Sequence, residues 1–112
     1  VISSGTGVGA SVPGLVVAGK TGTAQNPHGE DHAWFIAYAA RPGGPASIAI
    51  AVLIENGGHG GTVAAPVAKK MILARFSMPD PEAERAARVA ARAQRAALRA
   101  LALPASPTAV PL

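Results

Sequence analysis

A lysine, two threonines and a glycine stand together at Lys20, Thr21, Gly22 and Thr23, at the end of an apolar run. Such a group can bind an anion in two chemically different ways. Counted from Gly14, the residues up to Thr21 match the phosphate-loop pattern G-x-x-x-x-G-K-[ST] in full. On an extended strand the same side chains offer a fixed positive charge and hydroxyl donors, which suits a carboxylate.

The residues around the lysine exclude the phosphate loop. That loop needs a flexible turn followed by a helix N-terminus, whose N–H groups surround the phosphates. Here the spacer 15–18 reads Leu-Val-Val-Ala, and branched apolar residues favour a strand. Gly22 and the pair Asn26-Pro27 then interrupt the chain where the helix would have to begin. We therefore reject the nucleotide-binding interpretation.

A strand over about 14–24 gives each residue of the motif a definite side. Lys20 and Gly22 point to one face, and Thr21 and Thr23 to the other. Because Gly22 has no side chain, a substrate backbone or ring could lie against the strand there. A backbone N–H just after it can form half of an oxyanion hole. On Lys-Thr-Gly alone, a solvated lysine beside a polar turn remains the alternative.

Four sequence blocks in a fixed order favour the binding strand over that alternative. They are GKTGTAQ at 19–25, HAWFIAYA at 32–39, IAIAVLIENGG at 48–58 and AAPVAKKMIL at 64–73. In this order, about residues 1–76 resemble the C-terminal end of the transpeptidase domain of class B high-molecular-weight penicillin-binding proteins. These bacterial enzymes cross-link peptidoglycan. Serine β-lactamases and D,D-carboxypeptidases share Lys-Thr-Gly, but the Ala-Trp-Phe and Glu-Asn-Gly-Gly blocks fit them less well.

The resemblance implies roles for the motif residues. Lys20 would shape the electrostatics of the site and help bind the carboxylate of the substrate or of a β-lactam. Thr23 would lend its backbone N–H to the oxyanion hole and its hydroxyl to that carboxylate, and Thr21 and Gly22 complete the motif. The implied ligands are D-alanyl-D-alanine stem peptides and β-lactams, with division or elongation proteins as further partners. No cofactor, metal or nucleic acid is implied.

The nucleophile that this family requires is missing from the sequence. Acyl transfer needs an activated nucleophile next to a base, which the family supplies as a serine with a lysine three residues later, beside a Ser-x-Asn element. No serine of this chain has lysine at the third following position or asparagine at the second. We therefore expect part of a peptidoglycan D,D-transpeptidase, a partial sequence that is inactive alone. The alternative is a non-catalytic remnant or binding module that retains the carboxylate-binding strand.

The elements that must position the motif form an α+β fold. Three strands are expected over about 14–24, 32–40 and 46–54, and their short connections make them antiparallel neighbours. A helix with Pro66 in its first turn and its end near Phe76 should cover one face of the sheet. Residues 1–77 would then be a fragment of the penicillin-binding and serine β-lactamase-like fold. Residues 78–112 would be a linker, an Ala/Arg-rich helix and a disordered end.

Composition agrees with such a fragment. The 112 residues are 49% hydrophobic, enough for one small core. Cysteine is absent, which indicates nothing firm about the cellular compartment. The net charge of +4 is divided between both halves, and nothing else indicates a nucleic-acid interface. The longest apolar runs are too short to span a membrane. The resemblance nevertheless implies the extracytoplasmic face of the bacterial membrane as the location of the parent protein.

Two smaller groups of residues have competing interpretations. Trp34, Phe35 and Tyr38 could form a stacking platform, but aromatic residues in an apolar strand indicate core packing. The loops also carry residues of metal-binding type: His28, Glu30, Asp31, His32 and His59. Their spacing matches no established ligand pattern, so loop polarity is the better explanation.

The last third of the chain is basic and helix-favouring. Asp80 suits the N-cap and Pro81 the first helical position, before a helix over 82–103. Arginines at spacings of three and four predict one stripe along it: Arg85, Arg88, Arg92, Arg95 and Arg99. The opposite side is expected to be weakly apolar: Val89, Ala93, Ala96, Ala100 and Leu103. A solvated appendage is favoured over contact with lipid, wall polymer or an acidic partner.

Overall fold

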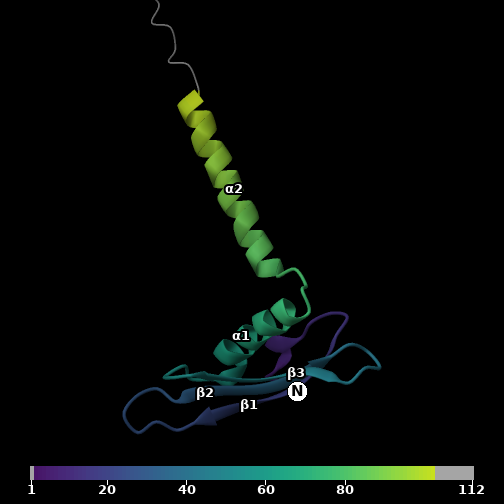
Figure 1. Cartoon of the computed structure of the whole chain (residues 1–112). Helices are drawn as coiled ribbons and strands as arrows, with labels where there is room; N and C mark the ends of the chain where they lie inside the picture. The colour runs from purple at the N-terminus through teal and green to yellow at the C-terminus, as the bar shows by residue number, and fades with distance from the viewer. Residues whose placement is uncertain (1, 103–112) are drawn as a thin grey trace, which may run out of the picture. The chain divides into compact units, whose positions relative to one another are not determined.

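The computed structural model describes residues 2–102 of the chain (Figure 1). The chain forms two compact units, residues 1–79 and residues 80–112. The elements in chain order are a 3-10 helix η1 (Val8–Ala10), strands β1 (Val16–Ala24), β2 (His32–Ala40) and β3 (Ala46–Ile54), and helices α1 (Gly60–Arg75) and α2 (Pro81–Ala102).

The three strands form one antiparallel sheet in the order β1-β2-β3 (Figure 1). The register is continuous, so that Thr21 lies opposite Phe35 and Phe35 opposite Val52, with one irregularity between Ala39 and Ala40. Among the described residues β1 pairs on one side only, which leaves its outer edge free. The strands are those predicted, except that β1 begins at Val16 because Gly14, at φ +83°, belongs to the turn before it.

Helix α1 covers one face of the sheet and forms the core of the first unit with it (Figure 1). Phe35 of β2 and Ile72 of α1 are the two largest fully buried side chains of the described chain. Around them lie mostly alanines and branched residues: Ala33, Ala37, Ala39, Ile50, Val52, Ala64, Ala65, Ala68 and Leu73. The small alanines of α1 let the helix approach the sheet closely, and burial of this apolar surface stabilises the unit.

No described residue covers the other face of the sheet to the same extent, and this corrects one prediction. Trp34, Ile36 and Tyr38 are 39%, 55% and 50% exposed. Side chains on a strand alternate between faces, so these three lie opposite Phe35. Core packing is therefore confirmed for Phe35 and wrong for Trp34 and Tyr38 within this chain. The sequence could not distinguish the two faces because both are apolar.

The start of α1 also differs from the prediction. The helix begins at Gly60, and Pro66 lies inside it rather than in its first turn. Two glycines at the start are poor helix formers, so propensity alone does not reveal this turn. The predicted end near Phe76 is confirmed. Ser77 has φ +52°, and the Met78 N–H donates to Leu73 O at 2.9 Å, which is the Schellman arrangement of helix ends.

Helix α2 has the predicted start and no buried residue among those described. The Asp80 carboxylate accepts a hydrogen bond from the Glu82 N–H at 2.9 Å, which confirms the N-cap. At about 100° per residue, Val89, Ala93, Ala96 and Ala100 lie about a quarter turn from the arginine stripe, so the predicted opposite side is wrong. The residues opposite the stripe are Ala83, Ala86, Ala90, Gln94, Ala97 and Leu101.

Leu103 and the predicted disordered end lie outside the described residues. None of the described helices has both the length and the apolar character to cross a membrane.

Because Phe35 and Ile36 lie on opposite faces of the sheet, truncating each of them to alanine should lower the free energy of unfolding by different amounts. Phe35→Ala should lower the free energy of unfolding by about 3–5 kcal/mol, because it opens a cavity under α1. Ile36→Ala, on the open face, should cost about 1 kcal/mol or less. Urea unfolding of the 112-residue chain measures both variants, and equal losses would contradict the assignment of faces.

Candidate functional site

The Lys-Thr-Gly-Thr motif lies on β1, with its side chains divided between the faces as predicted. Thr21 and Thr23 point to the side of α1, where they line a cleft together with residues of its first turn. Lys20 starts on the open face, where it lies beside Ile36 and Tyr38. Gly22 shares that face, and a Cβ added there would lie 3.3 Å from Trp34 Cβ.

The lysine side chain brings its charge from the open face to the free edge of β1. Lys20 Nζ donates a hydrogen bond of 2.7 Å to the carbonyl oxygen of Thr21. Gly22 lies opposite Trp34, and a Cβ on Gly60 would meet both Gly22 O and Trp34 O, so the Gly22 carbonyl points toward β2. Successive carbonyls of a strand point to opposite edges, and the Thr21 carbonyl therefore points outward from the sheet. The ammonium group therefore lies at the strand edge next to the two threonines, although its backbone position belongs to the other face.

The same alternation directs a backbone donor to that edge. In an antiparallel strand, the N–H and C=O of one residue point to the same side, and residues two apart share that side. Because the Thr21 carbonyl points outward, the N–H of Thr23 points outward too. The free edge thus combines one cation with outward-pointing backbone N–H groups, among them that of Thr23, which is the donor set for an oxyanion.

A cleft of about 430 Å³ lies next to this edge. Its lining residues come from the N-terminal segment, β1 and the start of α1: Thr6, Thr21, Thr23, His59, Gly60, Gly61 and Thr62. The hydroxyls of Thr6 and Thr21 are hydrogen-bonded to each other at 2.9 Å. No lining residue is acidic, and none is a serine or cysteine. The cleft therefore offers donors for a carboxylate but no serine or cysteine nucleophile.

Sequence reasoning missed Thr6, His59 and Thr62 as parts of this cleft. The two glycines that follow His59 are the signal that could have found them. A Cβ on Gly60 would collide with Trp34 O and lie 2.9 Å from Gly22 O, and one on Gly61 would collide with Thr6 O. The first turn of α1 therefore packs directly on the backbone of the motif strand, and only glycine permits this approach.

Two of the residues of metal-binding type, Asp31 and His32, make structural hydrogen bonds through their side chains. His32 Nδ1 accepts from the Asn56 N–H at 3.0 Å, and the Asp31 carboxylate accepts from the Asn26 N–H at 3.2 Å. Asn26 Nδ2 also donates to Asn56 Oδ1 at 2.7 Å. Within residues 2–102, no three histidine, cysteine or acidic side chains are grouped as a metal site. The bonds to Asn56 join the β1–β2 loop and the start of β2 to the turn after β3, and the bond between Asn26 and Asp31 closes the loop itself.

Comparison with known proteins finds one family. Residues 1–73 match the family described as Penicillin binding protein transpeptidase domain. The chain is 43% identical over 73 residues to the peptidoglycan D,D-transpeptidase PbpA of Mycobacterium tuberculosis, an alignment that covers 55% of this chain and 14% of that protein. It is 39% identical over 97 residues to the peptidoglycan D,D-transpeptidase MrdA of Acinetobacter baumannii, covering 70% of this chain and 14% of that protein.

A solved structure is similar as well. It is penicillin-binding protein A from M. tuberculosis as an imipenem acyl-enzyme complex, with a TM-score of 0.51 and 40% sequence identity. The match covers 60% of this chain and 15% of that chain. The chain therefore spans about one seventh of the length of the relatives that it matches.

The close approach of α1 predicts a stability effect at Gly60. Gly60→Ala should lower the free energy of unfolding by about 1–3 kcal/mol, because the new methyl group meets backbone oxygens that cannot move independently. Alanine is the better helix former, so propensity alone predicts the opposite sign. Gly9→Ala is the matched control, since its Cβ meets Gly61 O at 3.5 Å, an ordinary contact. A Gly60→Ala chain as stable as wild type in urea would disprove the contact.

Proposed function

The chain belongs to the penicillin-binding protein transpeptidase family, and on this premise we propose that it supplies the substrate-binding edge of a class B peptidoglycan D,D-transpeptidase. The observation that carries the proposal is the hydrogen bond from Lys20 Nζ to Thr21 O. It holds a positive charge at the free edge of β1, beside a cleft lined by hydroxyls. The substrates are D-alanyl-D-alanine stem peptides, and β-lactams are inhibitors that occupy the same edge.

The carboxylate of the substrate or the β-lactam binds first in this scheme. Lys20 supplies a whole positive charge at the edge, and the hydroxyls of Thr21 and Thr23 supply directed donors from the cleft side. Charge-assisted hydrogen bonds of this kind are the stronger class. Gly22 leaves the strand surface between them without a side chain, so that a peptide or ring can lie along β1.

The outward N–H of Thr23 acts in the chemical step. A serine Oγ attacks the carbonyl carbon of the penultimate D-alanine, and the carbonyl oxygen takes up negative charge. The Thr23 N–H donates to that oxygen as half of the oxyanion hole. The C–N bond to the terminal D-alanine then breaks, and the serine proton passes through a base to the leaving amine. An acyl-enzyme remains for transfer to an acceptor amine.

The serine and the base belong to other parts of the enzyme in this proposal. This chain has no serine in the required pattern, and no serine lines the cleft. The complete enzyme would act at the extracytoplasmic face of the bacterial membrane, where peptidoglycan is made, with proteins of cell division or elongation as its partners. The alternative function is a binding module that retains the carboxylate site without chemistry.

Lys20→Ala in the complete enzyme tests the role of the motif. The rate of acylation by benzylpenicillin should fall by about 100-fold, because a preorganised charge for the carboxylate is lost. Lys70→Ala is the matched control, since it removes a lysine charge from the exposed side of α1 and should leave acylation unchanged. An acylation rate close to wild type in the Lys20→Ala enzyme would refute the role. A complete wild-type protein that binds penicillin without acylation would favour the binding module.

The 112-residue chain alone should form no covalent adduct with benzylpenicillin. Intact-mass spectrometry after prolonged incubation measures this directly. The complete enzyme serves as the positive control and should gain the mass of one penicillin. A stoichiometric adduct on the isolated chain would mean that a nucleophile lies within these residues, against the proposal.

A further inference from the structure

The arginine stripe of α2 lies outside the segment that the transpeptidase family explains. The family match ends at residue 73, whereas the stripe comprises Arg85, Arg88, Arg92, Arg95 and Arg99. None of these residues is buried. The proposed catalytic function uses none of them, so the stripe needs a separate explanation.

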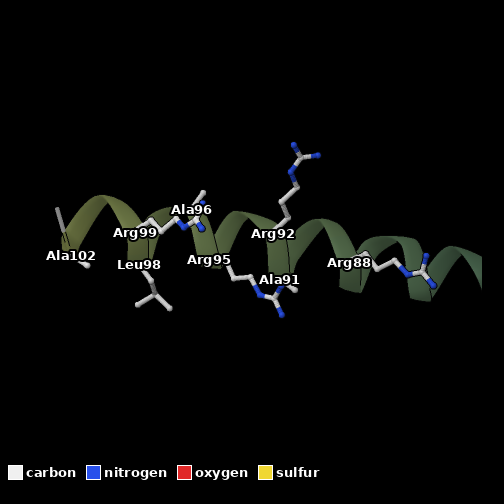
Figure 2. Close-up of a pocket in the computed structure, with 8 residues that line it drawn as sticks. All are labelled: Arg88, Ala91, Arg92, Arg95, Ala96, Leu98, Arg99 and Ala102. Carbon is white, nitrogen blue, oxygen red and sulfur yellow. The ribbon is translucent and has the colours of Figure 1, made fainter.

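Helical geometry makes the stripe straight and narrow. At about 100° per residue the five arginines fall within an arc of about 80°, and at about 1.5 Å per residue they extend along about 21 Å of the helix. Figure 2 shows the Arg92 and Arg95 side chains extended away from the helix, toward opposite edges of the view, with Ala91, Ala96 and Ala102 as small neighbours. The arc of backbone positions is narrow enough for the long, exposed side chains of all five arginines to turn toward a single flat surface.

The charge of the stripe is mostly uncompensated within the helix. Arg88 lies 3.9 Å from Glu84, but both side chains are largely exposed, and such pairs contribute little. The acidic residues of α2 stand in its first turn, and none follows Glu84. Arg92, Arg95 and Arg99 thus have no acidic residue within one helical turn on either side. A surface of this kind attracts anions over about a Debye length.

In place of the solvated appendage that composition favoured, we infer that α2 binds the surface of an anionic phospholipid bilayer through this stripe. All five cations are arginines, whose planar N–H groups match phosphate oxygens in pairs. The neighbouring side chains are alanines and Leu98, without the aromatic anchors that protein interfaces place at their centres. Phosphate headgroups form a flat anionic layer, and binding to them requires no shape complementarity. A straight row of arginines on α2 is therefore enough for such binding.

The helix adsorbs to the headgroups and does not insert. The side opposite the stripe is made of alanines, Gln94 and Leu101, too little apolar surface for burial among acyl chains. Contact is therefore electrostatic and falls steeply with salt. This separates α2 from a helix that binds through an apolar face, whose attachment persists at high salt.

Co-sedimentation of the 112-residue chain with vesicles tests the inference. The chain should bind vesicles of phosphatidylcholine mixed with phosphatidylglycerol at low salt, and neither pure phosphatidylcholine nor the mixed vesicles at high salt. Arg92→Gln with Arg95→Gln should weaken binding by about 30-fold, from the usual contribution of one cation near an anionic surface. Circular dichroism checks that the helix content of each variant is unchanged.

A rearranged variant separates the stripe from net charge. Arg92→Ala and Arg95→Ala combined with Ala90→Arg and Ala97→Arg keep the composition but move two arginines to the opposite side. Binding that falls as in the Gln variant supports the stripe, and binding equal to wild type overturns it in favour of net charge. Absence of vesicle binding, with or without binding to polyglutamate, also overturns the inference. None of these outcomes depends on penicillin acylation, so they leave the proposed function unaffected.

Discussion

The close contact between the first turn of α1 and the backbone of β1 and β2 determines much of this molecule. Gly60 and Gly61 lie against Trp34 O, Gly22 O and Thr6 O, with no room for a Cβ. The contact fixes the start of the helix, so that Ile72 and Leu73 meet Phe35 in the core. It also forms the wall of the cleft beside Thr21 and Thr23. Core and candidate site therefore share one constraint.

The free edge of β1 depends on a second constraint, the alternation of an antiparallel strand. The threonine hydroxyls face the cleft, the Thr21 carbonyl and Thr23 N–H face outward, and Lys20 reaches the same edge from the other face. Four consecutive residues thus supply charge, hydroxyls and a backbone donor to one place. Family membership, class and fold class, as expected from sequence, are confirmed by the matched relatives. The roles of the individual motif residues stay proposals.

The sequence predicted correctly those features that depend on interactions between residues close together in the chain. The strands, the motif alternation, the Asp80 N-cap and the end of α1 follow from apolar runs, turns and capping residues. Tertiary contacts determine what was missed. Gly60 begins a helix because it packs on a strand, and Trp34 and Tyr38 are exposed because no described residue covers their face. Thr6 and His59 line the cleft because the first turn of α1 packs on the strands and on the N-terminal segment, and no short sequence motif predicts this contact.

The order of strands has a consequence for how the first unit assembles. β1, β2 and β3 follow one another in the sheet as they do in the chain, and their connecting loops are short. Each loop that closes during folding therefore costs little chain entropy. The contacts within the two hairpins have low sequence separation, which favours rapid formation, whereas those of α1 with β1 and with the segment around Thr6 are long-range. The sheet can grow by one hairpin at a time, and α1 can then close over it as the last step.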